Sequence, residues 1–116
     1  MCSTVSVYRN FEENLLKMTI KEVKEKLKTS KGPVALSLHQ GSGFKTLVLG
    51  FNKGMILKEH KAHLKSKLTV LKGAVIYQEQ DRKVTLDQYD EVDIPLEVTH
   101  WVEALEDSLC LLTQGN

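Results

Sequence analysis

The sequence predicts an all-β domain, a barrel or sandwich of short strands, with one short helix near its N-terminus. From residue 34 onward, runs of strand-forming residues recur at intervals of about 8–12 residues and are separated by turn residues. The chain shows no alternation of strands with helical patterns, and it has no GxGxxG or GKS/GKT phosphate loop. Many short strands with turn signals between them are typical of sandwiches and barrels.

Nine strands are expected, and turn residues separate them. The first two, residues 34–39 and 44–51, are divided by Gly41-Ser42-Gly43, and Asn52-Lys53-Gly54 follows the second. We interpret Asp81-Arg82 as a tight hairpin turn between two later strands. The other expected strands are residues 55–59, 67–71, 74–80, 83–86, 91–94, 100–104 and 108–113.

The segment before the strands has a helical pattern. Thr19 followed by Glu22 matches a capping box, and Gly32-Pro33 ends any helix. Apolar residues recur there at helical spacing: Ile20, Val23 and Leu27. We expect an amphipathic helix over residues 19–29 that packs on a larger body, because so short a helix is marginal alone.

Composition limits the classes of partner. The chain has 116 residues, enough for one domain, which we divide into an N-terminal extension (1–33) and a barrel (34–116). Its 16 basic and 15 acidic residues nearly cancel, so we expect no nucleic-acid partner. A lysine cluster lacks interleaved aromatic residues and is interpreted as a solvated face: Lys58, Lys61, Lys65, Lys67 and Lys72. No apolar stretch approaches the roughly 20 residues that span a bilayer, so no membrane is expected.

The two cysteines indicate a reducing compartment. Neither Cys2 nor Cys110 has a CxxC partner or a metal-ligand spacing. Cys110 lies in an apolar run and is interpreted as a small buried hydrophobic residue. Because Glu12 and Glu13 interrupt any signal-like start, we expect a cytoplasmic protein.

Two groups of residues at fixed spacing lie within the strand region. In the first, His60 follows Gly54 after five residues, and Gly73 closes the group. In the second, four residues separate Pro95 from His100, and a short segment lies between the two groups.

These groups resemble the paired motifs of the cupin superfamily. At the other motif positions Ala62 and Ser66 stand for the second histidine and the glutamate of the first motif. In the second motif Tyr89, Glu97 and Ala104 replace glycine, glycine and asparagine. The resemblance covers about residues 34–113, is nearest to small bacterial single-domain cupins, and implies a cupin-type β-barrel (double-stranded β-helix or jelly roll).

The resemblance also implies a site inside the barrel. Residues two apart in a strand point to the same side, so cupins aim a His-x-His pair inward to hold iron, manganese, nickel or zinc. This chain keeps His60 and His100 and replaces the other two ligands. A His60–His63–His100 metal site is one hypothesis, although regular alternation would turn His63 away from His60. In the other hypothesis no metal is bound, and a pocket is lined by three hydrogen-bonding residues: His60, His100 and Ser66.

Three functions are therefore considered. The first is a module that binds a small molecule in the barrel pocket. The second is a metal-dependent oxygenase or isomerase, a reaction list that the resemblance implies, with Glu97 in the turn as a candidate base. The third is a structural domain with a vestigial site. Losing two ligand positions favours the first and third. A homodimer is expected because an open barrel leaves edge strands, and Trp101 is a candidate contact.

Overall fold

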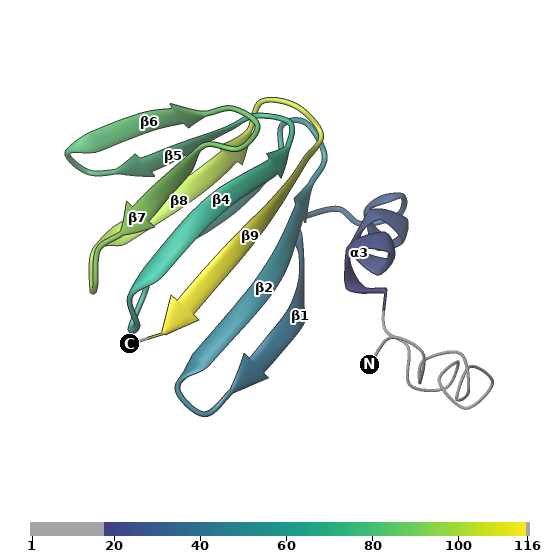
Figure 1. The fold of residues 1–116 in the computed structure, drawn as a ribbon. Coiled ribbons are helices and arrows are strands. Elements are labelled where there is room, and N and C mark those ends of the chain that lie inside the picture. The colour runs from purple at the N-terminus through teal and green to yellow at the C-terminus, as the bar shows by residue number, and fades with distance from the viewer. Residues whose placement is uncertain (1–17, 116) are drawn as a thin grey trace.

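The computed structural model describes residues 18–115, and of Glu59 and His60 it describes the backbone only. The expected helix is confirmed as α3, Thr19–Leu27, and the nine expected strands are all present within a few residues of their predicted ends (Figure 1). They are β1 Val34–Gly41, β2 Phe44–Phe51, β3 Ile56–Lys61, β4 Ser66–Lys72, β5 Val75–Glu79, β6 Arg82–Leu86, β7 Glu91–Ile94, β8 Thr99–Ala104 and β9 Ser108–Gly115.

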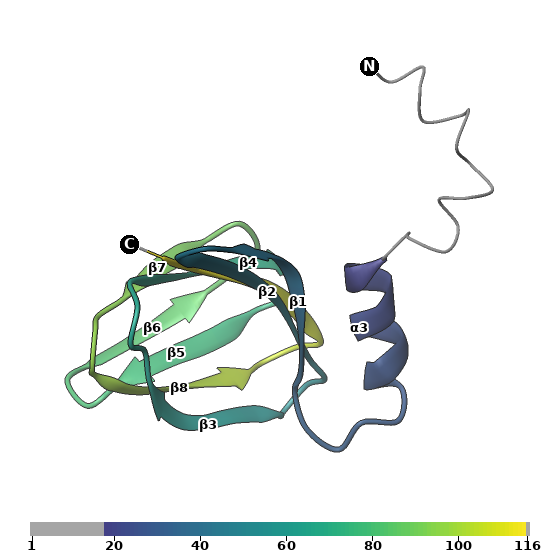
Figure 2. The ribbon, with the colours of Figure 1, turned by 90° about the horizontal axis from the view of Figure 1, so that it is seen from below.

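The strands form two antiparallel sheets. One has the order β1-β2-β9-β4-β7 and the other the order β3-β8-β5-β6. Seen from below, the two sheets face each other and enclose the barrel interior, while α3 lies outside it (Figure 2). In the part of the chain that the structure describes, no helix is long and apolar enough to cross a membrane.

Buried side chains alternate with more exposed ones along β4, β7 and β8, and the inward-facing side chains of the barrel form one apolar core. On β4 the buried positions are Ser66, Leu68 and Val70, and on β8 they are every second residue from His100 to Ala104. Cys110 belongs to this core and is fully buried, which confirms its interpretation as a hydrophobic residue. Burial raises the pKa of its thiol to about 12, so it is not a thiolate at neutral pH.

Helix α3 packs on the outer face of the larger sheet beside β1 and β2 (Figure 1). Val23 and Leu27 form a second apolar cluster with Val48 and Leu109. The helix approaches closely because Gly50 has no side chain: a Cβ there would lie 2.4 Å from Val23 Cγ1. The expected docking of the helix on the barrel is therefore confirmed.

Two details of the helix differ from the sequence expectation. Thr19 does not cap the helix, since Met18 is the N-cap residue and no side-chain capping hydrogen bond forms. Ile20 is 37% exposed, whereas Thr19 is buried. With Thr19 as the first helical residue rather than the cap, its side chain turns toward the barrel and Ile20 faces outward.

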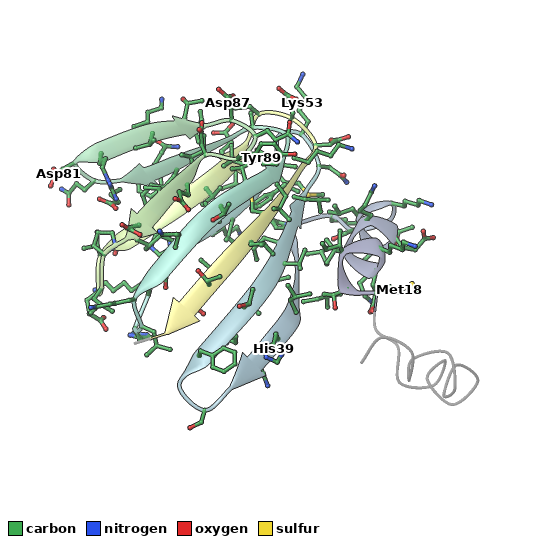
Figure 3. All side chains as sticks on the ribbon, viewed as in Figure 1. Met18, His39, Lys53, Asp81, Asp87 and Tyr89 are labelled. Atoms are coloured by element: carbon green, nitrogen blue, oxygen red, sulfur yellow. The ribbon has the colours of Figure 1, made fainter. Side chains whose placement is uncertain are left out.

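The turn between β5 and β6 also differs by one residue. Glu79 pairs directly with Arg82, so the turn consists of Gln80 and Asp81 (Figure 3). The sequence expectation of an Asp81-Arg82 turn was wrong, and Arg82 is instead the first residue of β6. Because strand residues alternate sides, this one-residue shift decides which face Arg82 occupies.

Backbone dihedrals support the motif register. Gly54 and Gly73 have φ angles of 87° and 89°. Tyr89 and Glu97, which stand at motif glycine positions, have φ angles of 72° and 59°. This left-handed conformation is common only for glycine, and it costs other residues about 1–2 kcal/mol each. The turns of the motif therefore persist without their glycines.

Helix docking predicts a position-dependent loss of stability. We expect Leu27→Ser to lower the free energy of unfolding by about 2–4 kcal/mol, because it removes a buried side chain from the interface with β2. Ile20→Ser, on the same helix but exposed, should cost under about 1 kcal/mol. Urea unfolding of both variants measures this, and equal losses would show that the helix is not packed.

Candidate functional site

Polar residues gather at one end of the barrel interior. On β5 the inward row runs Val75, Tyr77, Glu79, and Glu79 pairs with His100 on β8 and with Arg82 on β6. Five strands end their inward rows in this way with a polar residue: Ser66, Glu79, Arg82, His100 and Gln114. We call these five residues and Tyr77 the polar barrel end. The opposite end of the same rows is mostly apolar, with Val70, Val75, Leu86, Ala104 and Cys110, and its buried polar residue is Ser108.

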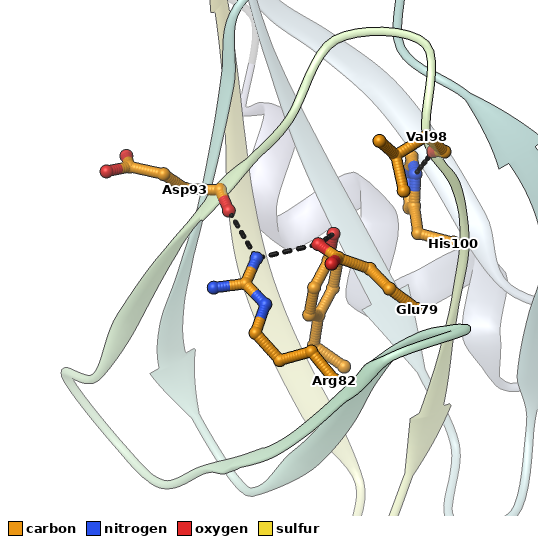
Figure 4. A network of polar contacts seen from close by, with 6 residues as sticks. Glu79, Arg82, Asp93, Val98 and His100 are labelled. Atoms are coloured by element: carbon orange, nitrogen blue, oxygen red, sulfur yellow. Dashed lines mark hydrogen bonds and ion pairs between the residues drawn. The ribbon is translucent and has the colours of Figure 1, made fainter.

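Glu79 is the centre of this arrangement. Its Oε2 accepts a hydrogen bond from the Tyr77 hydroxyl at 2.5 Å and one from Arg82 Nη2 at 2.6 Å (Figure 4). The same Nη2 donates to the backbone carbonyl of Asp93 at 3.0 Å, which links β6 to β7 of the other sheet. The Arg82 guanidinium also lies 5.4 Å from the centre of the Tyr77 ring, a cation–π contact.

The network fixes the charges of its members. The hydrogen bond from Arg82 holds the pKa of Glu79 below its usual value, against the opposing effect of partial burial. Burial raises the pKa of Tyr77 far above its ordinary range, and the hydrogen bond to Glu79 raises it further. The bond to Glu79 raises the pKa of Arg82. At neutral pH the site therefore holds a carboxylate, a guanidinium and a neutral hydroxyl.

His100 lies beside this network and is 2% exposed. Its ring centre is 5.7 Å from that of Tyr77. Its Nδ1 is 3.1 Å from the carbonyl oxygen of Val98 (Figure 4). Because a carbonyl oxygen only accepts, Nδ1 carries a proton, and in the neutral ring the lone pair is on Nε2. His60 is the direct partner of His100 in the β3–β8 ladder, and its side chain lies outside the described residues.

The two replaced ligand positions face the interior. Ala62 is buried in the core, and Ser66 is 6% exposed. Ser66 Oγ donates to the carbonyl of Leu64 at 2.8 Å and accepts from Gln114 Nε2 at 3.1 Å. Ser66 thus lines the polar barrel end with its hydrogen bonds already made by protein groups.

His63 lies at the rim instead. Its ring is 79% exposed, and its Nδ1 is 2.8 Å from Oε2 of Glu97. Among the described side chains, no three His, Cys, Asp or Glu residues are grouped so that they could hold a metal ion. These described groups do not fit a three-donor centre, and we derive no chemical step through a metal.

Comparison with known proteins supports the fold through structure alone. No family model and no curated protein matches the sequence. A crystal structure of a cupin superfamily protein from Desulfitobacterium hafniense superposes with a TM-score of 0.69 at 16% identity, over 74% of this chain and 79% of its own. An RmlC-like cupin from Desulfovibrio desulfuricans matches with a TM-score of 0.68 at 22% identity, over 73% and 83%. This chain has the cupin fold.

A third similar structure is that of KdgF, a named protein. KdgF from Halomonas sp. has a TM-score of 0.66 at 21% identity, covering 76% of this chain and 84% of that one. Identities this low show the fold only. The function of this cupin barrel must therefore be argued from its own side chains.

Sequence reasoning missed three residues of the site, Tyr77, Glu79 and Arg82. The signal was present in the alternation of β5, where an apolar row ends in Tyr77 and Glu79. Arg82 was hidden because it had been placed in the turn. Glu79 and His100 are partners because β5 pairs with β8 in the sheet. A local sequence pattern does not predict which strands become neighbours.

The lowered pKa of Glu79 predicts a pH-dependent stability difference. We expect Glu79→Gln to lower the free energy of unfolding by about 1–2 kcal/mol at pH 7, allowing for screening at the half-exposed Arg82. Because the folded-state pKa lies below the ordinary value of 4.5, the carboxylate stabilises the fold above pH 4.5 and loses this effect as pH falls through the folded pKa.

Urea unfolding across pH 7 to pH 3 therefore should show the wild-type and Glu79→Gln stabilities converging in acid. Glu106→Gln, a change at an exposed loop carboxylate, is the control and should show no such convergence. A gap between wild type and Glu79→Gln that stays constant with pH would contradict the assigned charge of Glu79.

Proposed function

We propose that this cupin barrel is a binding module for a small molecule, with the polar barrel end as its binding site. The observation that carries the proposal is the convergence of Glu79, Arg82, His100 and Ser66 from four strands at one end of a mainly apolar interior. A few convergent polar groups above an apolar surface are the usual composition of a small-molecule site.

The layering of the site indicates the direction of approach. Arg82 is 41% exposed, Glu79 is 10% exposed, and Tyr77 lies beneath them, fully buried. Arg82 Nη2 donates to Glu79 and to the backbone carbonyl of Asp93, which holds the guanidinium at the mouth of the site. A guanidinium in this position suits a ligand with acceptor oxygens, above all a carboxylate.

The charge states favour binding over proton transfer. A general base works best when its pKa is near the working pH, and Arg82 moves the pKa of Glu79 in the opposite direction. Tyr77 has its pKa raised, so its hydroxyl is a poor general acid at neutral pH. The ion pair instead holds Arg82 in a fixed orientation, which reduces the entropy lost when a ligand binds.

A metal-dependent enzyme of the oxygenase or isomerase type is a second candidate. It is favoured by the register of β3 and β8, which makes His60 and His100 direct partners on neighbouring strands. The proton on Nδ1 of His100 also matches metal-binding histidines, which donate one nitrogen to a carbonyl and ligate with the other. His63, paired with Glu97, would have to leave that contact to complete a three-histidine site.

The binding site is tested by titrating a panel of small carboxylic acids and phenols into labelled protein followed by NMR. For the tightest member, we expect Arg82→Gln to raise the Kd about tenfold, since a charge-assisted hydrogen bond is lost. Lys83→Gln, which removes the same charge from the adjacent exposed residue, should leave the Kd unchanged.

His100→Ala should weaken binding and His39→Ala, on the β1–β2 hairpin, should not (Figure 3). Equal effects of Arg82→Gln and Lys83→Gln would overturn the site.

Elemental analysis of protein purified without an affinity tag or chelator separates the two candidates. The binding module predicts far less than one metal per chain, because two of four motif ligands are replaced. Zinc, nickel, iron or manganese near one equivalent, lost in both His60→Ala and His100→Ala, would instead establish the metal enzyme. Loss in His63→Ala as well would assign the third ligand.

We also propose a cytoplasmic homodimer. β1 is an edge strand of the larger sheet, and Leu38 on it is 43% exposed. Exposed apolar edges are commonly covered by a partner. Trp101, half-buried on β8, remains a second candidate contact.

Light scattering at tens of micromolar should give about twice the chain mass of 13.1 kDa. Leu38→Asp should shift the mass toward the monomer, while Tyr89→Asp, which is 74% exposed in a loop, should not. A monomer mass for the wild-type protein would exclude the dimer.

A further inference from the structure

A second candidate binding site lies outside the barrel, between helix α3 and the apolar end of the strands. A groove of about 300 Å³ is bounded there by the helix and by the ends of β2, β4 and β9. Its floor is formed by Leu27, Phe51 and Leu109, all buried. It is thus at the opposite end of the inward rows from Glu79, Arg82 and His100, and it is separate from the proposed binding site.

The walls of this groove are positively charged. Three lysines line it, Lys24 and Lys28 from the helix and Lys72 from β4, against one carboxylate, Asp107. Lys28 pairs with Glu25 at 3.0 Å, whereas Lys24 and Lys72 have no ion pair with any described residue. Asp107 Oδ1 already accepts a hydrogen bond from the Lys53 backbone N–H at 2.8 Å. The whole chain carries a net charge of only +1, so this groove concentrates positive charge.

The groove is held in shape by the docking of the helix. Asn52 Nδ2 donates to the carbonyl oxygen of Leu27 at 2.8 Å, which ties the end of α3 to the loop after β2. Close packing of Val23 and Leu27 over Gly50 fixes the helix laterally. The docked helix therefore places Lys24 and Lys28 opposite Lys72 of β4 across the groove before any ligand binds.

We infer that this groove binds a small dianion with a compact apolar body, a phosphate monoester. Lys24 and Lys72, which have no ion pair with any described residue, supply two cations from opposite walls for a doubly charged phosphate, and lysine ammonium groups act on phosphate as point charges. The apolar floor takes the body of the ligand, while the volume suits a small molecule rather than a chain segment.

The probes are phenyl phosphate, inorganic phosphate and phenol, titrated into the full-length protein and followed by NMR. Phenyl phosphate should bind most tightly, because only it uses both the charged walls and the apolar floor. Its shift changes should map to α3, Asn52 and Ser108, and its affinity should fall as salt is raised. No saturable binding, or shifts confined to the polar barrel end, would overturn the inference.

Charge variants decide the assignment. Lys24→Gln and Lys72→Gln should each raise the Kd for phenyl phosphate about fivefold, and Asp107→Asn should lower it. Lys83→Gln and Arg82→Gln are controls at the other end of the barrel and should leave it unchanged. If Lys83→Gln weakened binding as much, the effect would come from the net charge of the protein, and the groove would be excluded as the site. If only Arg82→Gln weakened binding, phenyl phosphate would bind at the polar barrel end instead.

Discussion

The two sheets are held together by the burial of their inward-facing rows, and this constraint also decides where polar chemistry can exist. An interior position accepts a polar side chain only where that side chain finds partners, because an unpaired buried polar group is costly. In this barrel most inward polar residues lie together at one end, where Glu79 holds both Tyr77 and Arg82. At the opposite end the buried Ser108 hydroxyl bonds the backbone of Ala74. Among the described residues, every buried side-chain nitrogen and oxygen has a partner. The polar barrel end therefore exists because its inward polar side chains satisfy one another's hydrogen bonds.

The strands were predictable because their signals are local. Turn residues and two-residue alternation define each strand without knowledge of its neighbours, and motif spacing added the expectation of a cupin barrel. The polar barrel end was not predictable in the same way, since Glu79 and His100 become partners only through the β5–β8 pairing. A one-residue error in the β5–β6 turn was enough to remove Arg82 from the inward row. The helix shows the same limit: its periodicity was visible, but the close approach permitted by Gly50 was not.

His100 connects the two kinds of reasoning. Motif spacing selected it, and the structure buries it beside Tyr77 with its Nδ1 directed at a backbone carbonyl. What the motif did not indicate is that His100 shares its surroundings with an ion pair rather than with a glutamate ligand. An electrostatic interaction with His100 is also among the causes of the lowered pKa of Glu79, although it contributes less than the hydrogen bond from Arg82 does. A ligand that neutralises or displaces one member of this group would therefore alter the others, so the site responds as a unit.

The motif positions can be divided by what each requires. Positions that shape the backbone have kept their conformation even where glycine is lost, since Tyr89 and Glu97 adopt positive φ angles at a cost of about 1–2 kcal/mol each. That cost is met because backbone hydrogen bonds hold both turns: the Tyr89 N–H donates to the carbonyl of Val70 at 2.7 Å, and the Glu97 N–H donates to the carbonyl of Ala62 at 2.9 Å. Positions that only ligate a metal are under no such constraint from the fold, and there Ala62 and Ser66 have been accommodated in the interior. The barrel geometry is thus independent of the side chains at these two motif positions, and the same end of the barrel can carry a different set of polar groups without any change in topology.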